Sequence, residues 1–173
     1  MAMVQCRLRM RGRPLQWRTL VVALAMVVLA CALFWALAPP RYDTNDDVAI
    51  RLRLEGVSVP GQPATGYVVL SHAALGWTLV VLGRVIPAVP WWDVVVAATL
   101  LWAIATLLAM GWDKLGDEWL ARGAATAVVL VATLPLVLAL QYTISATVAG
   151  GTAVLLAVSE LATPSSPRRG VIL

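Results

Sequence analysis

The chain has 173 residues, of which 61% are hydrophobic and 13% are charged, and its net charge is +4. Soluble domains carry about 25% charged residues, so this composition excludes an ordinary water-soluble domain and predicts a multi-pass cell-membrane protein. Because each crossing needs about 20 apolar residues, the length allows about four or five crossings joined by short loops. We therefore expect an all-α, polytopic transmembrane helix bundle over residues 19–161, with about five spans and four as the alternative.

Residues 1–18 form a basic segment, which we expect to be a cytoplasmic tail. Five arginines occur there without an acidic residue: Arg7, Arg9, Arg11, Arg13 and Arg18. Basic residues beside the first span mark the cytoplasmic side of a membrane protein, and they can contact anionic lipid headgroups. The segment lacks the interleaved aromatic residues and folded platform of a nucleic-acid interface, so no nucleic-acid partner is expected.

The first apolar segment, residues 19–38, is predicted to be an uncleaved membrane anchor. Ala36-Leu37-Ala38 at its end resembles a signal-peptidase site. The segment is longer than the apolar core of a signal peptide, however, and further apolar segments follow it. Cys31 lies in this anchor and Cys6 in the tail, and their spacing fits no metal motif and predicts no disulfide.

Two further spans are predicted at residues 67–89 and 94–111. They are separated by the sequence "PWWD", and paired tryptophans are typical of the headgroup region. Arg84 is expected to reach the cytoplasmic interface from the end of its span. His72 lies near the other end, where an interfacial and a functional role are both open. The charged residues 113–122 are predicted to be a solvated external loop.

Residues 123–159 carry no charge. As one helix they would be about 55 Å long, whereas the hydrocarbon core is about 30 Å thick. We therefore predict two spans, residues 123–140 and 144–161, with a turn at the polar cluster 141–147 and a kink at Pro135.

The Pro/Ser-rich residues 162–173 are expected to be a disordered tail. In a five-span arrangement Arg168 and Arg169 of this tail would lie outside the cytoplasm. That position conflicts with the positive-inside rule, so the arrangement of the last two spans is left open.

The acidic sequence "YDTNDD", residues 42–47, is predicted to begin a short interfacial helix in the first external loop. Thr44 and Asp47 have the spacing of a capping box, with Asp in place of Glu or Gln. Asp46 and Asp47 would lie in the first turn, where the helix dipole favours negative charge. Residues 48–56 also alternate apolar and charged side chains, so a strand is the alternative. In the simplest interpretation the aspartates cap the helix and face water.

A second interpretation is a catalytic site. Asp46 or Asp47 would act as the general base that removes a proton from an acceptor hydroxyl. Arg41, Arg51 and Arg53 would bind a substrate phosphate, since guanidinium groups match phosphate oxygens. The paired carboxylates could also hold a divalent metal through oxygen ligands, although the metal requirement and any cofactor are unknown.

An apolar anchor followed by an acidic pair and an interfacial helix resembles the N-terminal part of GT-C-class lipid-linked sugar glycosyltransferases. The sequences "LEG", "GQP" and "VPWWD" within residues 41–93 also resemble those of a group of uncharacterised bacterial membrane proteins. The resemblance implies that Asp46 or Asp47 holds the catalytic position and that the donor is a polyprenyl-phosphate sugar at the outer leaflet. Members of the class usually have more spans, so a truncated remnant and a short relative with another role are both open.

The alternative to an enzyme is a non-catalytic small membrane subunit or assembly partner. A transporter is less favoured, because transporters place ionisable groups or broken helices at the bilayer midplane, and only residues 141–147 could serve there. The sequence contains no Ser-His-Asp set, phosphate-binding glycine loop or metal-spaced Cys/His cluster, which argues against soluble-type hydrolase or NTPase chemistry.

Overall fold

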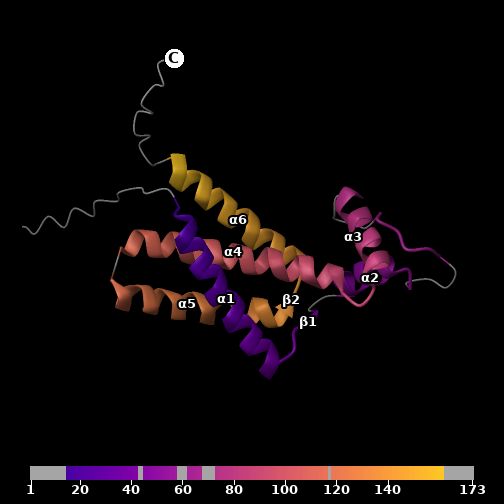
Figure 1. Cartoon of the computed structure of the whole chain (residues 1–173), viewed down its shortest axis with the longest axis horizontal. Coiled ribbons are helices and arrows are strands. Elements are labelled where there is room, and N and C mark those ends of the chain that lie inside the picture. The colour runs from indigo at the N-terminus through magenta and orange to yellow at the C-terminus, as the bar shows by residue number, and fades with distance from the viewer. Residues whose placement is uncertain (1–14, 43–44, 58–61, 68–72, 117, 162–173) are drawn as a thin grey trace, which may run out of the picture.

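The computed structural model describes residues 15–42, 45–57, 62–67, 73–116 and 118–161. These residues form six helices and two short strands (Figure 1): α1 Trp17–Leu37, β1 Arg41–Tyr42, α2 Asn45–Glu55, α3 Ala73–Val85, α4 Trp91–Leu115, α5 Trp119–Leu138, β2 Ala139–Leu140 and α6 Tyr142–Leu161. The helices α1, α4, α5 and α6 are long and apolar enough to cross a membrane. The predicted all-α membrane bundle is therefore confirmed, with four candidate spans in the described part of the chain.

Helix α4 lies at the centre of the bundle, and α1, α5 and α6 pack around it. In its middle, four consecutive residues from Ala103 to Thr106 are buried, so no face of the helix is free there. By contrast α1 buries one stripe, in which Leu20, Ala23, Val27 and Cys31 recur every three or four residues. The outer faces of the surrounding helices keep large apolar side chains exposed, which suits a lipid environment.

The chain reverses between α5 and α6 at residues 139–141, just before the polar cluster 141–147. Helix α5 continues through Pro135 and ends at Leu138, and α6 starts at Tyr142. Each helix has 20 residues, or about 30 Å, which matches the hydrocarbon thickness. The charge-free segment therefore contains two helices long and apolar enough to span, as predicted, and the second is longer than expected.

Residues from the beginning of the chain hold this reversal in place. Strand β2 pairs in parallel with β1, with Ala139 opposite Arg41. The indole N–H of Trp35 on α1 donates to the carbonyl of Val137 at 3.0 Å. This bond satisfies a carbonyl in the last turn of α5 that has no partner within its own helix.

The segment predicted as a span over residues 67–89 contains only the 13-residue helix α3 in its described part. At 1.5 Å per residue α3 is about 20 Å long, too short to cross a hydrocarbon core of about 30 Å. In Figure 1 it runs across the direction of α4 and lies beside α2. Gly66 lies close against Gly76 and Trp77. A side chain at Gly66 would collide with Trp77, and a side chain at Gly76 would collide with the carbonyl of Gly66. The segment before α3 thus lies against α3, and the described part of residues 67–89 holds no helix long enough to span.

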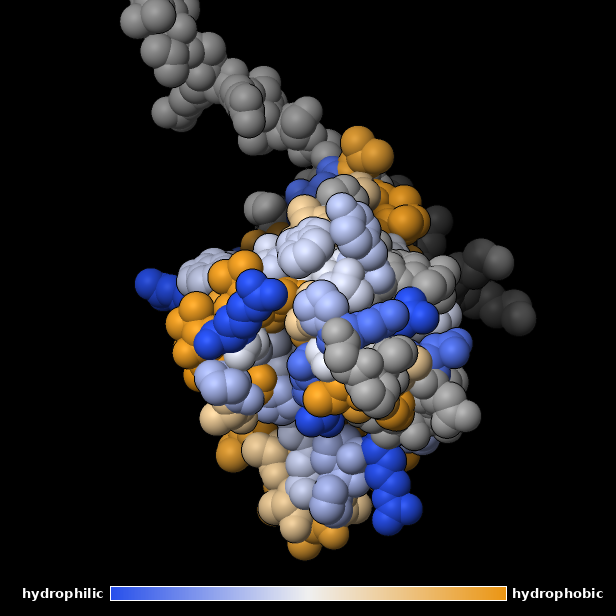
Figure 2. Space-filling model, turned by 90° about the vertical axis from the view of Figure 1, so that its right-hand side faces the viewer, coloured by the Kyte–Doolittle hydropathy of each residue, from blue (hydrophilic) through white to orange (hydrophobic). Residues whose placement is uncertain are grey.

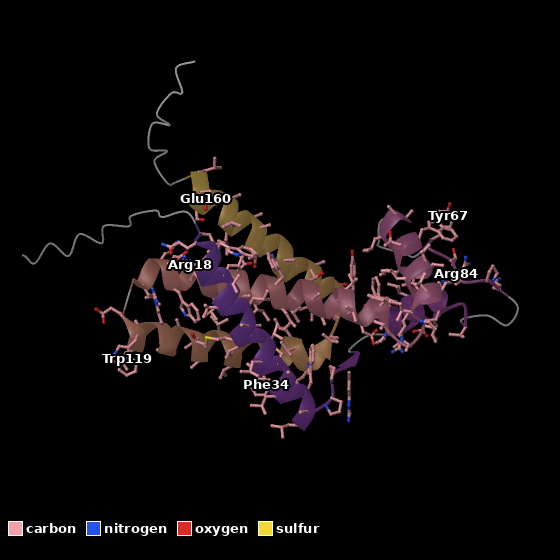
Figure 3. All side chains as sticks on the ribbon, in the orientation of Figure 1. Arg18, Phe34, Tyr67, Arg84, Trp119 and Glu160 are labelled. Atoms are coloured by element: carbon pink, nitrogen blue, oxygen red, sulfur yellow. The ribbon has the colours of Figure 1, made fainter. Side chains whose placement is uncertain are left out.

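The bundle has two distinct ends, which Figure 3 makes visible. Arg18, Trp119 and Glu160 lie at one end, and Tyr67 and Arg84 lie at the opposite end. We call them the tail end, where α1 begins and α6 finishes, and the loop end, which carries α2 and α3. Arg84, which was expected on the opposite side of the membrane from the acidic loop, is therefore at the same end as that loop.

Hydrogen bonds at the tail end place the α4–α5 connection there as well. The carboxylate of Asp113 accepts from the backbone N–H of Gln16 at 3.3 Å and from the hydroxyl of Thr19 at 3.1 Å. The backbone N–H of Leu15 donates to Glu160 at 3.5 Å. Residues 113–122 were expected on the side opposite the N-terminal tail. Residues at the start of this segment adjoin α1 instead, because α4 runs from the loop end to the tail end of the bundle.

Candidate functional site

The first turn of α2 places Asp47 inside the molecule. Asp47 is only 2% exposed. Its carboxylate accepts from the indole N–H of Trp92 at 3.3 Å and from the backbone N–H of Tyr142 at 3.2 Å. The rings of Trp92 and Tyr142 pack against each other with centroids 5.4 Å apart.

Asp47 therefore joins the starts of three helices. It lies in the first turn of α2, and it accepts from the first N–H of α6, which has no acceptor within that helix. Its negative charge is favourable at both helix starts because the dipole of each helix is positive there. The partner Trp92 belongs to the first turn of α4.

Asp46, the other predicted catalytic residue, is exposed and forms no ion pair with any residue that the structure describes. The expectation that the aspartates face water thus holds for Asp46 and is wrong for Asp47. Residues 45–55 are helical, so the helix is confirmed over the strand. Thr44, the proposed partner in the capping box, lies outside the described residues.

The three arginines predicted to bind phosphate do not converge on one point. Arg51 bridges α2 and α4, since its guanidinium bonds Glu55 at 2.8 Å and Asp93 at 3.2 Å. Arg53 is two residues further along α2 and therefore points to a different face of the helix. Arg41 is exposed on β1 and lines a separate cavity beside Asp93.

A cavity of about 290 Å³ lies between α2, α3 and the start of α4, and we call it the α2–α3 cavity. Its apolar wall includes Leu54, Leu79 and Val80, and its polar groups come from Arg51, Glu55 and Arg84. The other residues that line the cavity are Ala64, Gly83, Pro87, Val89, Trp91 and Trp92. Figure 2 faces this end of the molecule, where hydrophilic and hydrophobic side chains are interspersed.

Sequence reasoning missed two features of this region. Arg84 was assigned to the other side of the membrane, and Asp93 was treated as part of a boundary between spans. The acidic residue next to paired tryptophans was the available signal that the start of α4 is a polar contact point. His72 lies outside the described residues, and the described part of the chain has no group of three or more His, Cys, Asp or Glu that could hold a metal ion.

The fold and the site together define a class, a multi-pass integral membrane protein with two extra helices, α2 and α3, at one end of its bundle. Comparisons with family models, with curated proteins and with solved structures gave no match.

Proposed function

We propose that this chain is a non-catalytic membrane subunit or assembly partner. The observation that supports this function best is the burial of Asp47 and its use as an acceptor for Trp92 and Tyr142. A general base must be within hydrogen-bond reach of the proton that it removes. A carboxylate that is 2% exposed and already bonded to two other helices has a structural task and little room for an acceptor hydroxyl.

The arrangement of the spans also suits a partner protein. Helices α1, α5 and α6 pack mainly on α4 and leave large apolar residues such as Leu29, Val131 and Val154 exposed. These faces can take lipid or the helices of another membrane protein. Association between spans in a membrane uses close packing of such faces, because lipid is as apolar as the side chains.

We also propose that the loop end faces the outside of the cell membrane and that the tail end faces the cytoplasm. Four of the 13 basic residues adjoin the loop end, namely Arg41, Arg51, Arg53 and Arg84, so the remaining nine adjoin the tail end in the sequence. This asymmetry agrees with the positive-inside rule. With four spans, Arg168 and Arg169 follow α6 on the cytoplasmic side, and the conflict of the five-span arrangement disappears.

A GT-C-like glycosyltransferase is the second candidate, and the exposure of Asp46 at the loop end favours it. In this function Asp46 would be the general base, and Arg51 would contact the phosphate of a polyprenyl-phosphate sugar. The arginine and the exposed carboxylate are both on α2, so a substrate at the outer leaflet could reach them.

Asn substitutions at Asp46 and Asp47 in the native host separate the two functions. If the chain is a non-catalytic subunit, we expect Asp46→Asn to leave the cell-surface glycans unchanged at normal protein levels. In the same case we expect Asp47→Asn to lower the protein level, since the side chain that accepts from Trp92 and Tyr142 becomes a weaker acceptor. If the chain is a transferase, we expect Asp46→Asn to lose a glycan while membrane insertion stays normal. That result would rule out the non-catalytic function.

A further inference from the structure

We propose that the α2–α3 cavity binds the phosphate group of a bilayer phospholipid, with Arg84 as the residue that contacts the phosphate. The cavity is lined by neither Asp46 nor Asp47, so lipid binding there is compatible with a subunit and with an enzyme.

The charges that line the cavity single out Arg84. Arg51 is already bonded to Glu55 and Asp93, so its positive charge is compensated by carboxylates. Arg84 reaches the cavity from α3 and forms no hydrogen bond or ion pair with any residue in the described ranges. A guanidinium carries five N–H donors in a planar arrangement that fits two phosphate oxygens at once. An anion is therefore the partner that this corner of the cavity can accept.

Apolar surface beside Arg84 favours an anion that is carried on a lipid. Leu54, Leu79 and Val80 line the cavity and are themselves buried, whereas Trp77, Val81 and Val85 on the helix of Arg84 are exposed. The glycerol and first methylenes of a phospholipid would cover part of that exposed face, which a soluble phosphate would leave in contact with water. The volume of about 290 Å³ is at the lower limit of small-molecule sites, so it suits a headgroup region and not an entire lipid.

The position of the cavity is also that of a membrane surface. It lies against Trp91, a half-buried tryptophan at the start of the central span, where tryptophans mark the headgroup level. Trp92, in contrast, is buried against Asp47. The outer face of α3 exposes Trp77, Val81 and Val85, which are four residues apart along one side of the helix. An apolar helix too short to span, with such a face uncovered at the end of a bundle, is suited to lie in the bilayer interface.

The test uses the full chain, purified in detergent and mixed with phosphatidylglycerol, and measures retained lipid by native mass spectrometry. Arg84→Gln should reduce retention at least about tenfold, because it removes the charge-assisted hydrogen bonds to the phosphate. Arg53→Gln removes the same charge from an exposed position that does not line the cavity, and it should retain lipid like the unmodified chain.

A second variant fills the cavity without touching the arginine. A Cβ atom added at Gly83 meets no atom within 4 Å, and Gly83 lines the cavity, so Gly83→Leu is expected to fold and to narrow the cavity. Gly111→Leu is the matched control, since Gly111 is also helical and has the same open surroundings but lies away from the cavity. We expect Gly83→Leu to lose lipid retention without a fall in unfolding temperature and Gly111→Leu to keep it.

Three results would overturn the proposal. Equal losses in Arg84→Gln and Arg53→Gln would mean that lipid binds to surface charge in general. Equal retention of diacylglycerol, which has no phosphate, would mean that the apolar wall alone binds it. Displacement of phosphatidylglycerol by millimolar glycerol phosphate would assign the cavity to a soluble anion.

Discussion

Asp47 carries a negative charge into the interior and is stabilised there by donors from two other helices. The sequence predicted its place in the first turn of α2 but could not predict its partners. Trp92 is 45 residues away along the chain and Tyr142 is 95 residues away. A local pattern of acidic residues describes a cap on its own helix, whereas here the same carboxylate also caps α6. Burial of this kind follows from the packing of α2 against the bundle.

Asp47→Ala should destabilise the protein, because the buried indole N–H of Trp92 and the part-buried backbone N–H of Tyr142 lose this acceptor. Each buried donor that loses its acceptor costs about 1–3 kcal/mol. Asp46→Ala at the neighbouring exposed position should change stability by less than about 0.5 kcal/mol. Thermal unfolding in detergent would compare the two. Equal unfolding temperatures would contradict the structural role of Asp47.

At the scale of elements, the spans that the sequence predicted well are those without interruption by charge. Residues 19–38 were assigned from apolar length, and residues 123–140 and 144–161 from apolar length together with the polar cluster between them. Helices α1, α5 and α6 match these segments to within four residues at either end. Helix α4 extends three to four residues beyond each end of the predicted span 94–111. The extension is physically reasonable because Asp93 and Asp113 have partners at the two ends.

The span predicted at residues 67–89 contains only the 13-residue helix α3 in its described part, and apolar length says nothing about where a chain folds back. The decisive contacts are those of Gly66 with Gly76 and Trp77, together with the edge-on packing of Tyr67 on Trp77 at 5.6 Å. They join the segment before α3 to its first turn. Sequence separation alone could not indicate that two glycines ten positions apart are in contact.

Gly76→Ala should destabilise the packing of α3 at the loop end. The added methyl group would collide with the backbone carbonyl of Gly66, which cannot move as cheaply as a side chain, and overpacking of this kind costs about 1–3 kcal/mol. Gly83→Ala lies in the same helix with open space around it and should stabilise the protein by about 0.5–1 kcal/mol. Unfolding in detergent would measure both, and a stabilised Gly76→Ala variant would contradict the close contact.

At the scale of the whole molecule, the course of the chain at α3 determines which residues share an end of the bundle. A crossing at residues 67–89 would put the α4–α5 connection opposite the start of α1. Without that crossing, Asp113 reaches Gln16 and Thr19 directly. The start of α1 and the end of α6 then lie at the same end of the bundle, as the bond from Leu15 to Glu160 requires.

Labelling of single cysteines on intact cells tests this topology. Cys6 and Cys31 are first replaced by alanine, and cysteines are then placed one at a time at three exposed positions: Arg53, Ala88 and Glu118. With four spans and the tail end in the cytoplasm, a membrane-impermeant maleimide should label Arg53→Cys and Ala88→Cys at once and Glu118→Cys only after permeabilisation.

Five spans predict the reverse order for two of these positions, because residues 67–89 would then carry the chain back to the cytoplasm before α4. Ala88→Cys would be protected and Glu118→Cys would be labelled, while Arg53→Cys would be labelled in either arrangement. Arg53→Cys therefore serves as the reference for an external position. Its protection, together with labelling of Glu118→Cys, would mean that the whole molecule is inverted and that the arginines of the N-terminal segment do not set its orientation.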